Sequence, residues 1–183
     1  KNGTLMIQRE FIAGFQGGDG GSPCYMKRKG KKNAYNFTFG DTSRHKCPEH
    51  VQSQVEFFEW MALVLEKLHV VTHQVRVSKD KNSPNPIVLL PISNSMESII
   101  SYMENVGYRY ADTKRKRGES VYYYMRYKRF QWKKQIALKE EIIQRNNDGE
   151  SPTALAKEFG LTSRQVHGMF EQAGKETFPS RTL

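Results

Sequence analysis

The sequence has little cysteine, few acidic residues and no long apolar run. Only two of its 183 residues are cysteines, Cys24 and Cys47, so a disulfide framework is excluded and a reducing compartment is expected. No stretch approaches the ~18 consecutive apolar residues of a membrane-spanning helix, and no signal-peptide pattern opens the chain. We therefore expect an intracellular protein of the cytoplasm, nucleus or organelle matrix that is neither secreted nor membrane-bound.

Basic residues are abundant and gather in two stretches. Lys and Arg number 29 against 19 Asp and Glu, which gives a formal net charge of +10. Residues 25–35 hold five basic residues and no acid, and residues 109–134 hold ten basic residues and two acids. Two basic segments on a nearly neutral body predict a polyanionic partner. Aromatic residues interleave the second stretch, and we expect most of them to pack in the core, with stacking on bases as the alternative.

The hydrophobic pattern predicts an α+β unit followed by an all-α module. Periodicity and breakers indicate helices near 5–15, 48–68 and 95–106, with strand pairs near 25–31 and 35–42 and near 70–77 and 87–92. This order, αββαββα, predicts one four-stranded antiparallel sheet. We expect the first domain over residues 1–110, a basic linker or helix over 111–134, and a helical module over 135–183.

The first predicted helix ends in a run of small residues and a single acid. Gly14, Gly17 and Gly18 lower helix stability by roughly 1 kcal/mol each, so a compensating contact is expected. A face of small residues lets a second backbone approach closely. Asp19, directly after that face, would then meet a symmetry-related Asp19, and a divalent cation between the two carboxylates would relieve their repulsion. The alternative is a glycine-rich turn with a solvated aspartate.

Residues 12–20 resemble the LAGLIDADG motif of homing endonucleases, which are associated with introns or inteins. Ile12-Ala13-Gly14-Phe15 falls on the first four motif positions and Asp19-Gly20 on the last two. The resemblance implies a saddle-shaped four-stranded sheet over the DNA major groove and a hydrolase that makes staggered double-strand breaks with Mg²⁺ or another divalent metal. It implies that Asp19 is the catalytic acid, that Asp19 and the Gly18 carbonyl bind the metal, and that the motif-helix interface is formed by Ile12, Ala13, Gly14 and Gly17.

This chain contains one such motif, whereas the family's mechanism uses two acids. The resemblance therefore implies a homodimer, or a second LAGLIDADG half outside this sequence. Alternating side chains of the two hairpins, and the basic segment after them, are expected to contact double-stranded DNA. The residues predicted to do so here are Lys27, Lys29, Lys31, Arg76, Lys114, Arg115, Lys116 and Arg117.

Some positions depart from the family pattern. The sixth motif position, often acidic, is Gly17, the fifth is the polar Gln16, and Ser43 stands where some members carry a glutamine. No catalytic basic residue can be matched. These departures leave open a non-catalytic LAGLIDADG-type transcription regulator. An RNA maturase is a third reading.

The C-terminal segment resembles a helix-turn-helix. Ala156, Gly160 and Val166 have the spacing of a small residue at a helix crossing, a glycine in the turn and an apolar anchor on the second helix. The preceding helix is expected near residues 136–146. At the start of the recognition helix, the residues predicted to face a DNA groove are Arg164, Gln165 and His167.

Histidine and cysteine offer weaker candidates. His45, Cys47 and His50 include conceivable zinc ligands, but their spacing matches no standard zinc finger. His69 and His73 straddle a predicted helix–strand junction and are not expected to bind metal.

Overall fold

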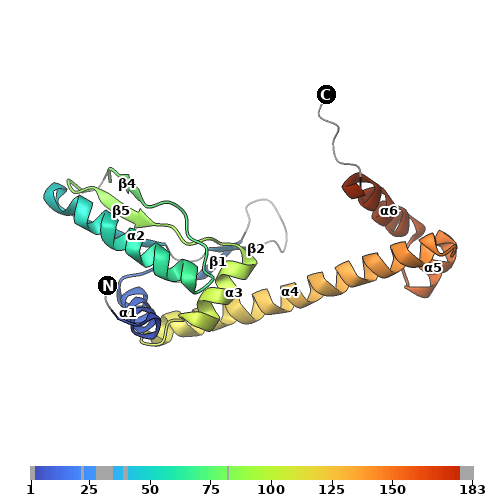
Figure 1. The fold of residues 1–183 in the computed structure, drawn as a ribbon, viewed down its shortest axis with the longest axis horizontal. Helices are drawn as coiled ribbons and strands as arrows, with labels where there is room; N and C mark the ends of the chain where they lie inside the picture. The colour runs from blue at the N-terminus through green and yellow to red at the C-terminus, as the bar shows by residue number, and fades with distance from the viewer. Residues whose placement is uncertain (1–2, 22, 28–34, 39–40, 82, 178–183) are drawn as a thin grey trace, which may run out of the picture. The chain divides into compact units, whose positions relative to one another are not determined.

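The computed structural model describes residues 3–21, 23–27, 35–38, 41–81 and 83–177. The chain divides into two compact units, residues 1–127 and 128–183 (Figure 1). Lys29 and Lys31 lie outside the described residues, and Lys27 is described only as the last residue of a strand. Among the described helices, none combines the length and the apolarity that crossing a membrane requires.

The glycine-rich segment ends helix α1 (Leu5–Gly18). Thr4 caps its N-terminus through a hydrogen bond from the Ile7 amide to the Thr4 hydroxyl. The helix continues three residues beyond the predicted end at Phe15, and its buried residues are Ile12, Ala13, Gln16 and Gly17. Asp19 follows as the C-cap and donates its backbone N–H to the Phe15 carbonyl at 2.8 Å.

The prediction of one four-stranded saddle sheet is wrong. Strands β1 (Cys24–Lys27) and β2 (Tyr35–Thr38) form a two-stranded antiparallel sheet. A separate three-stranded antiparallel sheet has the order β3-β5-β4, built from β3 (Thr42–His45), β5 (Ile87–Leu90) and β4 (Arg76–Ser78). The described residues are mainly helical, with only these two small sheets.

The break in the sheet lies within the single strand predicted over 35–42. β2 pairs with β1, whereas β3 pairs with β5. Asp41, just before β3, accepts the Gly21 N–H through its carbonyl at 3.1 Å and the Ile92 N–H through its carboxylate at 3.4 Å. The bond between Gly21 and Asp41 and the isolated bridge between Gly20 and Thr42 keep the register in which Cys24 faces Thr38. The predicted strand 70–77 is likewise reduced to β4 and an isolated bridge between Thr72 and Ile92.

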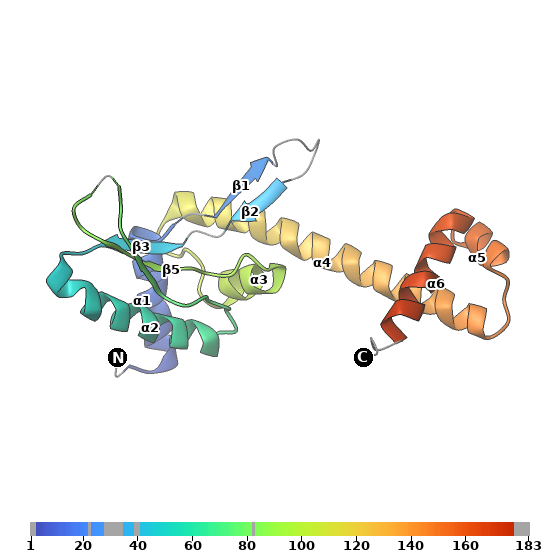
Figure 2. The ribbon, with the colours of Figure 1, turned by 90° about the horizontal axis from the view of Figure 1, so that it is seen from above.

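Two amphipathic helices complete the first core. Pro48–His50 forms a short 3₁₀ turn, η1, before helix α2 (Val51–Lys67), which runs along the three-stranded sheet (Figure 2). Helix α3 (Met96–Asn105) is capped by Ser95, whose hydroxyl accepts the Ser98 N–H, and Gly107 ends this region at φ +69°. The fully buried side chains of this core include Ile12, Phe58, Met61, Leu65, Leu90, Ile99, Ile100 and Tyr102.

Helix α4 (Asp112–Asn147) is one continuous element. The boundary between the two units falls inside it, after Tyr127, within the segment 111–134 that we predicted as a basic linker or helix. In the first unit only a narrow side of this helix is buried, at Gly118, Val121 and Met125. A Cβ added at Gly118 would lie 2.8 Å from the Met103 Cε, so the flexible end of the Met103 side chain would have to shift.

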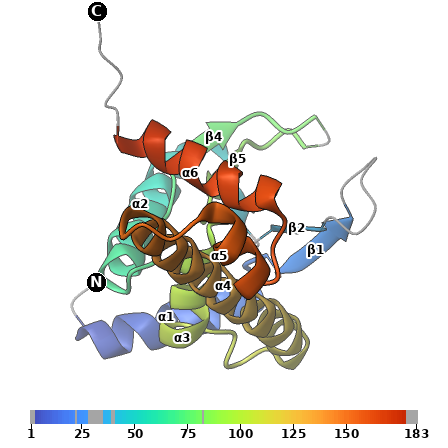
Figure 3. The ribbon, with the colours of Figure 1, turned by 90° about the vertical axis from the view of Figure 1, so that its right-hand side faces the viewer.

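The second unit is built from three helical segments. Helices α5 (Pro152–Glu158) and α6 (Ser163–Thr177) follow the end of α4 (Figure 3). Its core consists of Ile142, Leu155, Ala156 and Val166, and Gly160 takes φ +63° in the turn between α5 and α6. This is the arrangement of two helices and a tight turn that the sequence spacing predicts.

Candidate functional site

Asp19 lies at the end of α1, where a carboxylate is electrostatically disfavoured. The C-terminal end of a helix carries a partial negative charge, and an acid there costs about 0.3–1 kcal/mol when exposed. Asp19 is nevertheless half exposed at this point, with 50% of its side chain accessible. Cations nearby would offset the electrostatic cost of a carboxylate at this helix end.

Arg44 of β3 supplies the first compensating charge. Its guanidinium Nη2 donates to Asp19 Oδ2, and 35% of the Arg44 side chain is accessible. The guanidinium also lies 5.1 Å from the ring centroid of Phe15, in a cation–π contact. Arg44 thus links β3 of the three-stranded sheet to the end of α1, beside the predicted catalytic acid Asp19.

Lys114 supplies the second compensating charge at the end of α1. Its ammonium donates to three carbonyl oxygens at the end of α1, those of Gly20 at 2.6 Å, Gly18 at 3.1 Å and Gln16 at 3.2 Å. Two of these carbonyls flank Asp19 in the chain. Lys114, predicted as a DNA contact, therefore caps α1, and the Gly18 carbonyl, predicted as a metal ligand, accepts a hydrogen bond from it.

The polar residue at the fifth motif position has a structural role. Gln16 is fully buried, and its Nε2 donates to the hydroxyl of Thr42. A Cβ on Gly20 would lie 2.8 Å from the Gln16 main-chain oxygen and would overlap the Gln16 side chain. Glycine is therefore required at position 20 by the packing around Gln16. The buried Tyr108 hydroxyl donates to the Gly21 carbonyl at 3.2 Å and secures the next residue.

The predicted motif-helix interface is mostly covered by the chain itself. Ile12 and Ala13 have no accessible surface, and Gly17 faces Ala111, whose Cβ would lie 3.5 Å from an added Cβ. Gly14 is half buried. The exposed side of α1 instead carries Met6, Ile7 and Phe11, with 64%, 62% and 49% of their surface accessible, and Gly18, beside which a Cβ would meet nothing.

The described basic residues predicted to bind DNA differ in their surroundings. Arg76 is exposed on β4. On α4, Lys116 and Arg117 are exposed, and Arg115 pairs with Asp112 at 2.7 Å. In the second unit Arg164 and His167 are exposed near the start of α6.

Gln165 takes part in a helix cap. Its side-chain oxygen accepts the Thr162 N–H at 2.8 Å, while its own N–H donates to the Thr162 hydroxyl at 3.3 Å. This reciprocal pair is a capping box. The predicted groove contact therefore has a structural role at the start of α6.

The aromatic residues of the basic stretch are mostly exposed, contrary to the expectation that they pack in the core. The accessible fractions are 65% for Tyr123, 60% for Tyr127 and 53% for Trp132. The buried side of α4 is too narrow to hold them, since Val121 and Met125 already occupy it in the first unit. The side chains of Tyr122 and Tyr123 line a small pocket of about 270 Å³ beside α3.

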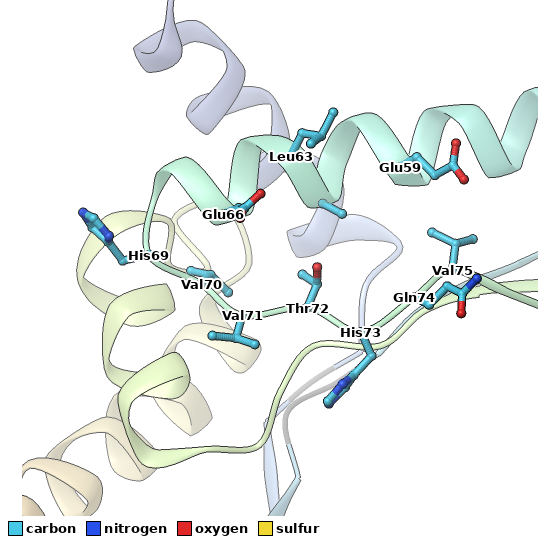
Figure 4. A pocket seen from close by; sticks show the side chains of 11 residues that line it. Glu59, Leu63, Glu66, His69, Val70, Val71, Thr72, His73, Gln74 and Val75 are labelled. Carbon is cyan, nitrogen blue, oxygen red and sulfur yellow. The ribbon is translucent and has the colours of Figure 1, made fainter.

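A larger hollow of about 710 Å³ lies along α2 and the segment that follows it. Figure 4 shows Glu59, Leu63 and Glu66 along the helix, with His69 and His73 on the following segment. The two histidine rings point in different directions in this view. Across the part of the chain that the structure describes, no three His, Cys, Asp or Glu side chains are placed to hold a metal ion together.

Comparisons of this chain with models of protein families, with curated proteins and with solved structures found no match. The LAGLIDADG resemblance therefore stays a prediction from residues 12–20. Arg44 and the capping role of Lys114 were missed from the sequence, since each contacts the end of α1 from at least 25 residues away.

Proposed function

We propose that this chain is a site-specific endonuclease that hydrolyses phosphodiester bonds of double-stranded DNA with a divalent metal. The observation that carries the proposal is the placement of Asp19. A half-exposed carboxylate stands at a helix end that disfavours negative charge, and two basic side chains, Arg44 and Lys114, surround it. A half-exposed carboxylate beside two basic side chains offers a metal ligand next to groups that attract phosphate.

The donor set fits one half of a magnesium site. Mg²⁺ is commonly held by one or two carboxylates together with substrate phosphates and water. Asp19 offers one carboxylate, so a second must come from another copy or another half, with phosphate oxygens completing the set. A metal bound there would activate water and stabilise the leaving oxygen. Met6, Ile7 and Phe11 form an exposed apolar side of α1 that a second chain could contact, in the N-terminal half of the helix, whereas Asp19 follows its C-terminal end.

The charge distribution supports DNA as the substrate. Exposed Arg76, Lys116 and Arg117 of the first unit can contact phosphates, and each such contact adds to a salt-dependent affinity. Arg164 and His167 lie near the start of the second helix of a helix-turn-helix, where that motif contacts base edges. In this proposal the second unit recognises the DNA sequence and the first unit cleaves the strand, so variants in each unit should affect the two steps separately.

The ion pair between Asp19 and Arg44 favours one alternative, a DNA-binding transcription regulator without catalysis. In that reading Arg44 neutralises Asp19 permanently, and Lys114 occupies the Gly18 carbonyl. Both readings predict binding to duplex DNA. Only the endonuclease predicts cleavage.

The experiment that separates them begins with selection of bound duplexes from a randomised library in Ca²⁺. The selected duplex is then incubated with the chain in Mg²⁺, beside the Asp19→Asn variant. The proposal predicts strand cleavage that requires Mg²⁺ and disappears in the variant. Salt-sensitive binding of one duplex as a complex containing two copies of the chain, without any cleavage, would instead establish the regulator.

A further inference from the structure

The pocket between α3 and α4 combines guanidinium groups with exposed aromatic rings. It lies within the first unit and has a volume of about 270 Å³. Its floor contains the buried Val106, Gly107 and Tyr108, and its rim carries charged and aromatic side chains. The rim residues are Arg109, Arg115, Glu119, Tyr122 and Tyr123.

Tyr122 and Tyr123 pack against each other, with the Tyr122 ring held by hydrogen bonds and the Tyr123 ring accessible. Their ring centroids are 5.3 Å apart, with 58° between the planes. The Tyr122 hydroxyl donates to Glu104 Oε1 at 2.8 Å and accepts from Arg126 Nη1 at 3.1 Å, which holds its ring in place. Tyr123 is 65% accessible, so its ring offers a face to a flat ligand.

The Arg115 guanidinium can receive an anion, whereas Arg109 donates to Glu10 Oε1 at 2.7 Å and to the Val106 carbonyl at 3.1 Å. Arg115 uses one of its five N–H donors on Asp112, an ion pair whose side chains are 46% and 76% accessible. Pairs exposed to this degree are weak, so a phosphate, which accepts two parallel hydrogen bonds from a guanidinium, can replace the carboxylate. Lys116 and Arg117, exposed next in the chain, strengthen the positive potential around the pocket.

Glu119 adds a base-reading group to this site. A carboxylate accepts hydrogen bonds from the amino and imino N–H groups of unpaired bases. A nucleotide combines such N–H groups with a flat ring and a phosphate. The volume is too small for a duplex and lies just below the range of drug-sized ligand pockets.

We infer that this pocket binds one unpaired nucleotide of a nucleic acid strand, with its base on Tyr123 and its phosphate on Arg115. The inference deepens the proposed function, since the bound strand would belong to the DNA that the chain recognises. It does not depend on cleavage, because no residue of the pocket contacts Asp19. An unpaired nucleotide can come from DNA or from RNA, and the chemistry of the pocket is shared by both.

The test measures binding of fluorescein-labelled single-stranded hexanucleotides to the full chain by anisotropy, in EDTA so that cleavage cannot occur. The matched pair of variants is Tyr123→Ala and Tyr127→Ala: both rings are exposed on α4, but Tyr127 does not line the pocket. Loss of one stacked base weakens binding roughly tenfold. We expect this loss for Tyr123→Ala and less than about a twofold change for Tyr127→Ala.

Further measurements test the phosphate contact and the type of nucleic acid. Arg115→Gln should lower the slope of log affinity against log salt by about 0.7, the value for one lost phosphate contact on a single strand. Deoxy and ribo forms of hexacytidine distinguish DNA from RNA as the source of the nucleotide.

Equal weakening by the two tyrosine variants, or no effect of Tyr123→Ala while its circular dichroism is unchanged, would overturn the inference. Neither result bears on the endonuclease, which is tested with duplex DNA and Mg²⁺. Absence of duplex cleavage would likewise leave the hexanucleotide result standing.

Discussion

Replacing Lys114 by methionine is expected to destabilise the first unit while leaving the second unchanged. The ammonium of Lys114 donates to the carbonyls of Gln16, Gly18 and Gly20 at 2.6–3.2 Å. Methionine keeps an aliphatic stem of similar length and removes the charge and the donors. The three carbonyls then lose a shared cation at the negative end of a helix.

The expected loss of stability follows from the number of hydrogen bonds that Lys114 makes and from their exposure to water. A hydrogen bond to a charged group contributes about 1.5–3 kcal/mol when buried. The Lys114 side chain is only half buried, and water can reach part of the freed carbonyl surface. Since the three bonds share one ammonium, their contributions do not add. We therefore expect a total loss of about 1–3 kcal/mol in the free energy of unfolding.

The assay must report on one unit at a time, because two units need not unfold together. The chain has two tryptophans, Trp60 in the first unit and Trp132 in the second. In a Trp132→Phe background, urea unfolding followed by Trp60 fluorescence measures the first unit alone. The control is Lys116→Met, which removes an exposed lysine and should change stability by less than about 0.5 kcal/mol. Equal effects of the two substitutions would refute the capping role of Lys114.

Three further predictions concern packing, turn geometry and acid stability. Gly20→Ala should cost the first unit about 1–3 kcal/mol by crowding Gln16, measured by Trp60 fluorescence; a neutral result would contradict the packing. Gly160→Ala should cost the second unit about 1–2 kcal/mol, because φ is +63°, whereas Gly168→Ala, within α6 where an added Cβ meets nothing, should cause no loss. Hydrogen bonds from Arg145 hold the pKa of Glu150 and Glu158 below the ordinary glutamate value. Their stabilisation is therefore complete above the ordinary pKa and lost as pH falls through the lowered values, so the second unit should lose stability below about pH 4. In a Trp60→Phe background, Arg145→Met should flatten that dependence in Trp132 fluorescence, and an unchanged pH profile would contradict the assignment.

The helices could be predicted because their information is local. Apolar residues at helical spacing place α2, and Ser95 and Gly107 bound the region of α3. The turn of the second unit was equally local, since Gly160 stands between Ala156 and Val166 at fixed offsets. In each case the residues that decide the conformation lie within a few turns of one another.

The sheet and the surroundings of Asp19 could not be predicted in the same way. Asp41, just before β3, bonds to Gly21 and Ile92, 20 and 51 residues away, so the surroundings of β3 depend on distant parts of the chain. The partners of the α1 end, Arg44 and Lys114, come from β3 and α4. The sequence marks these residues as basic, but it does not show which basic residue reaches which carbonyl or carboxylate.

The aromatics of the basic stretch were misjudged for a physical reason. Their spacing is compatible with a packed helix, but α4 has only a narrow buried side in the first unit, taken by Gly118, Val121 and Met125. Tyr123 and Tyr127 therefore remain at the surface. Exposed aromatic rings among basic residues are typical of binding surfaces rather than of cores.

The role of Asp19 in catalysis is tested by comparing DNA binding with DNA cleavage in the Asp19→Asn variant. On the selected duplex, affinity is measured in Ca²⁺ and cleavage in Mg²⁺, with both proteins checked for equal unfolding free energy. We expect the variant to bind as tightly as the wild type or more tightly, because one negative charge near the phosphates is removed, and not to cleave. If the variant cleaved at the wild-type rate, Asp19 would not be the catalytic acid.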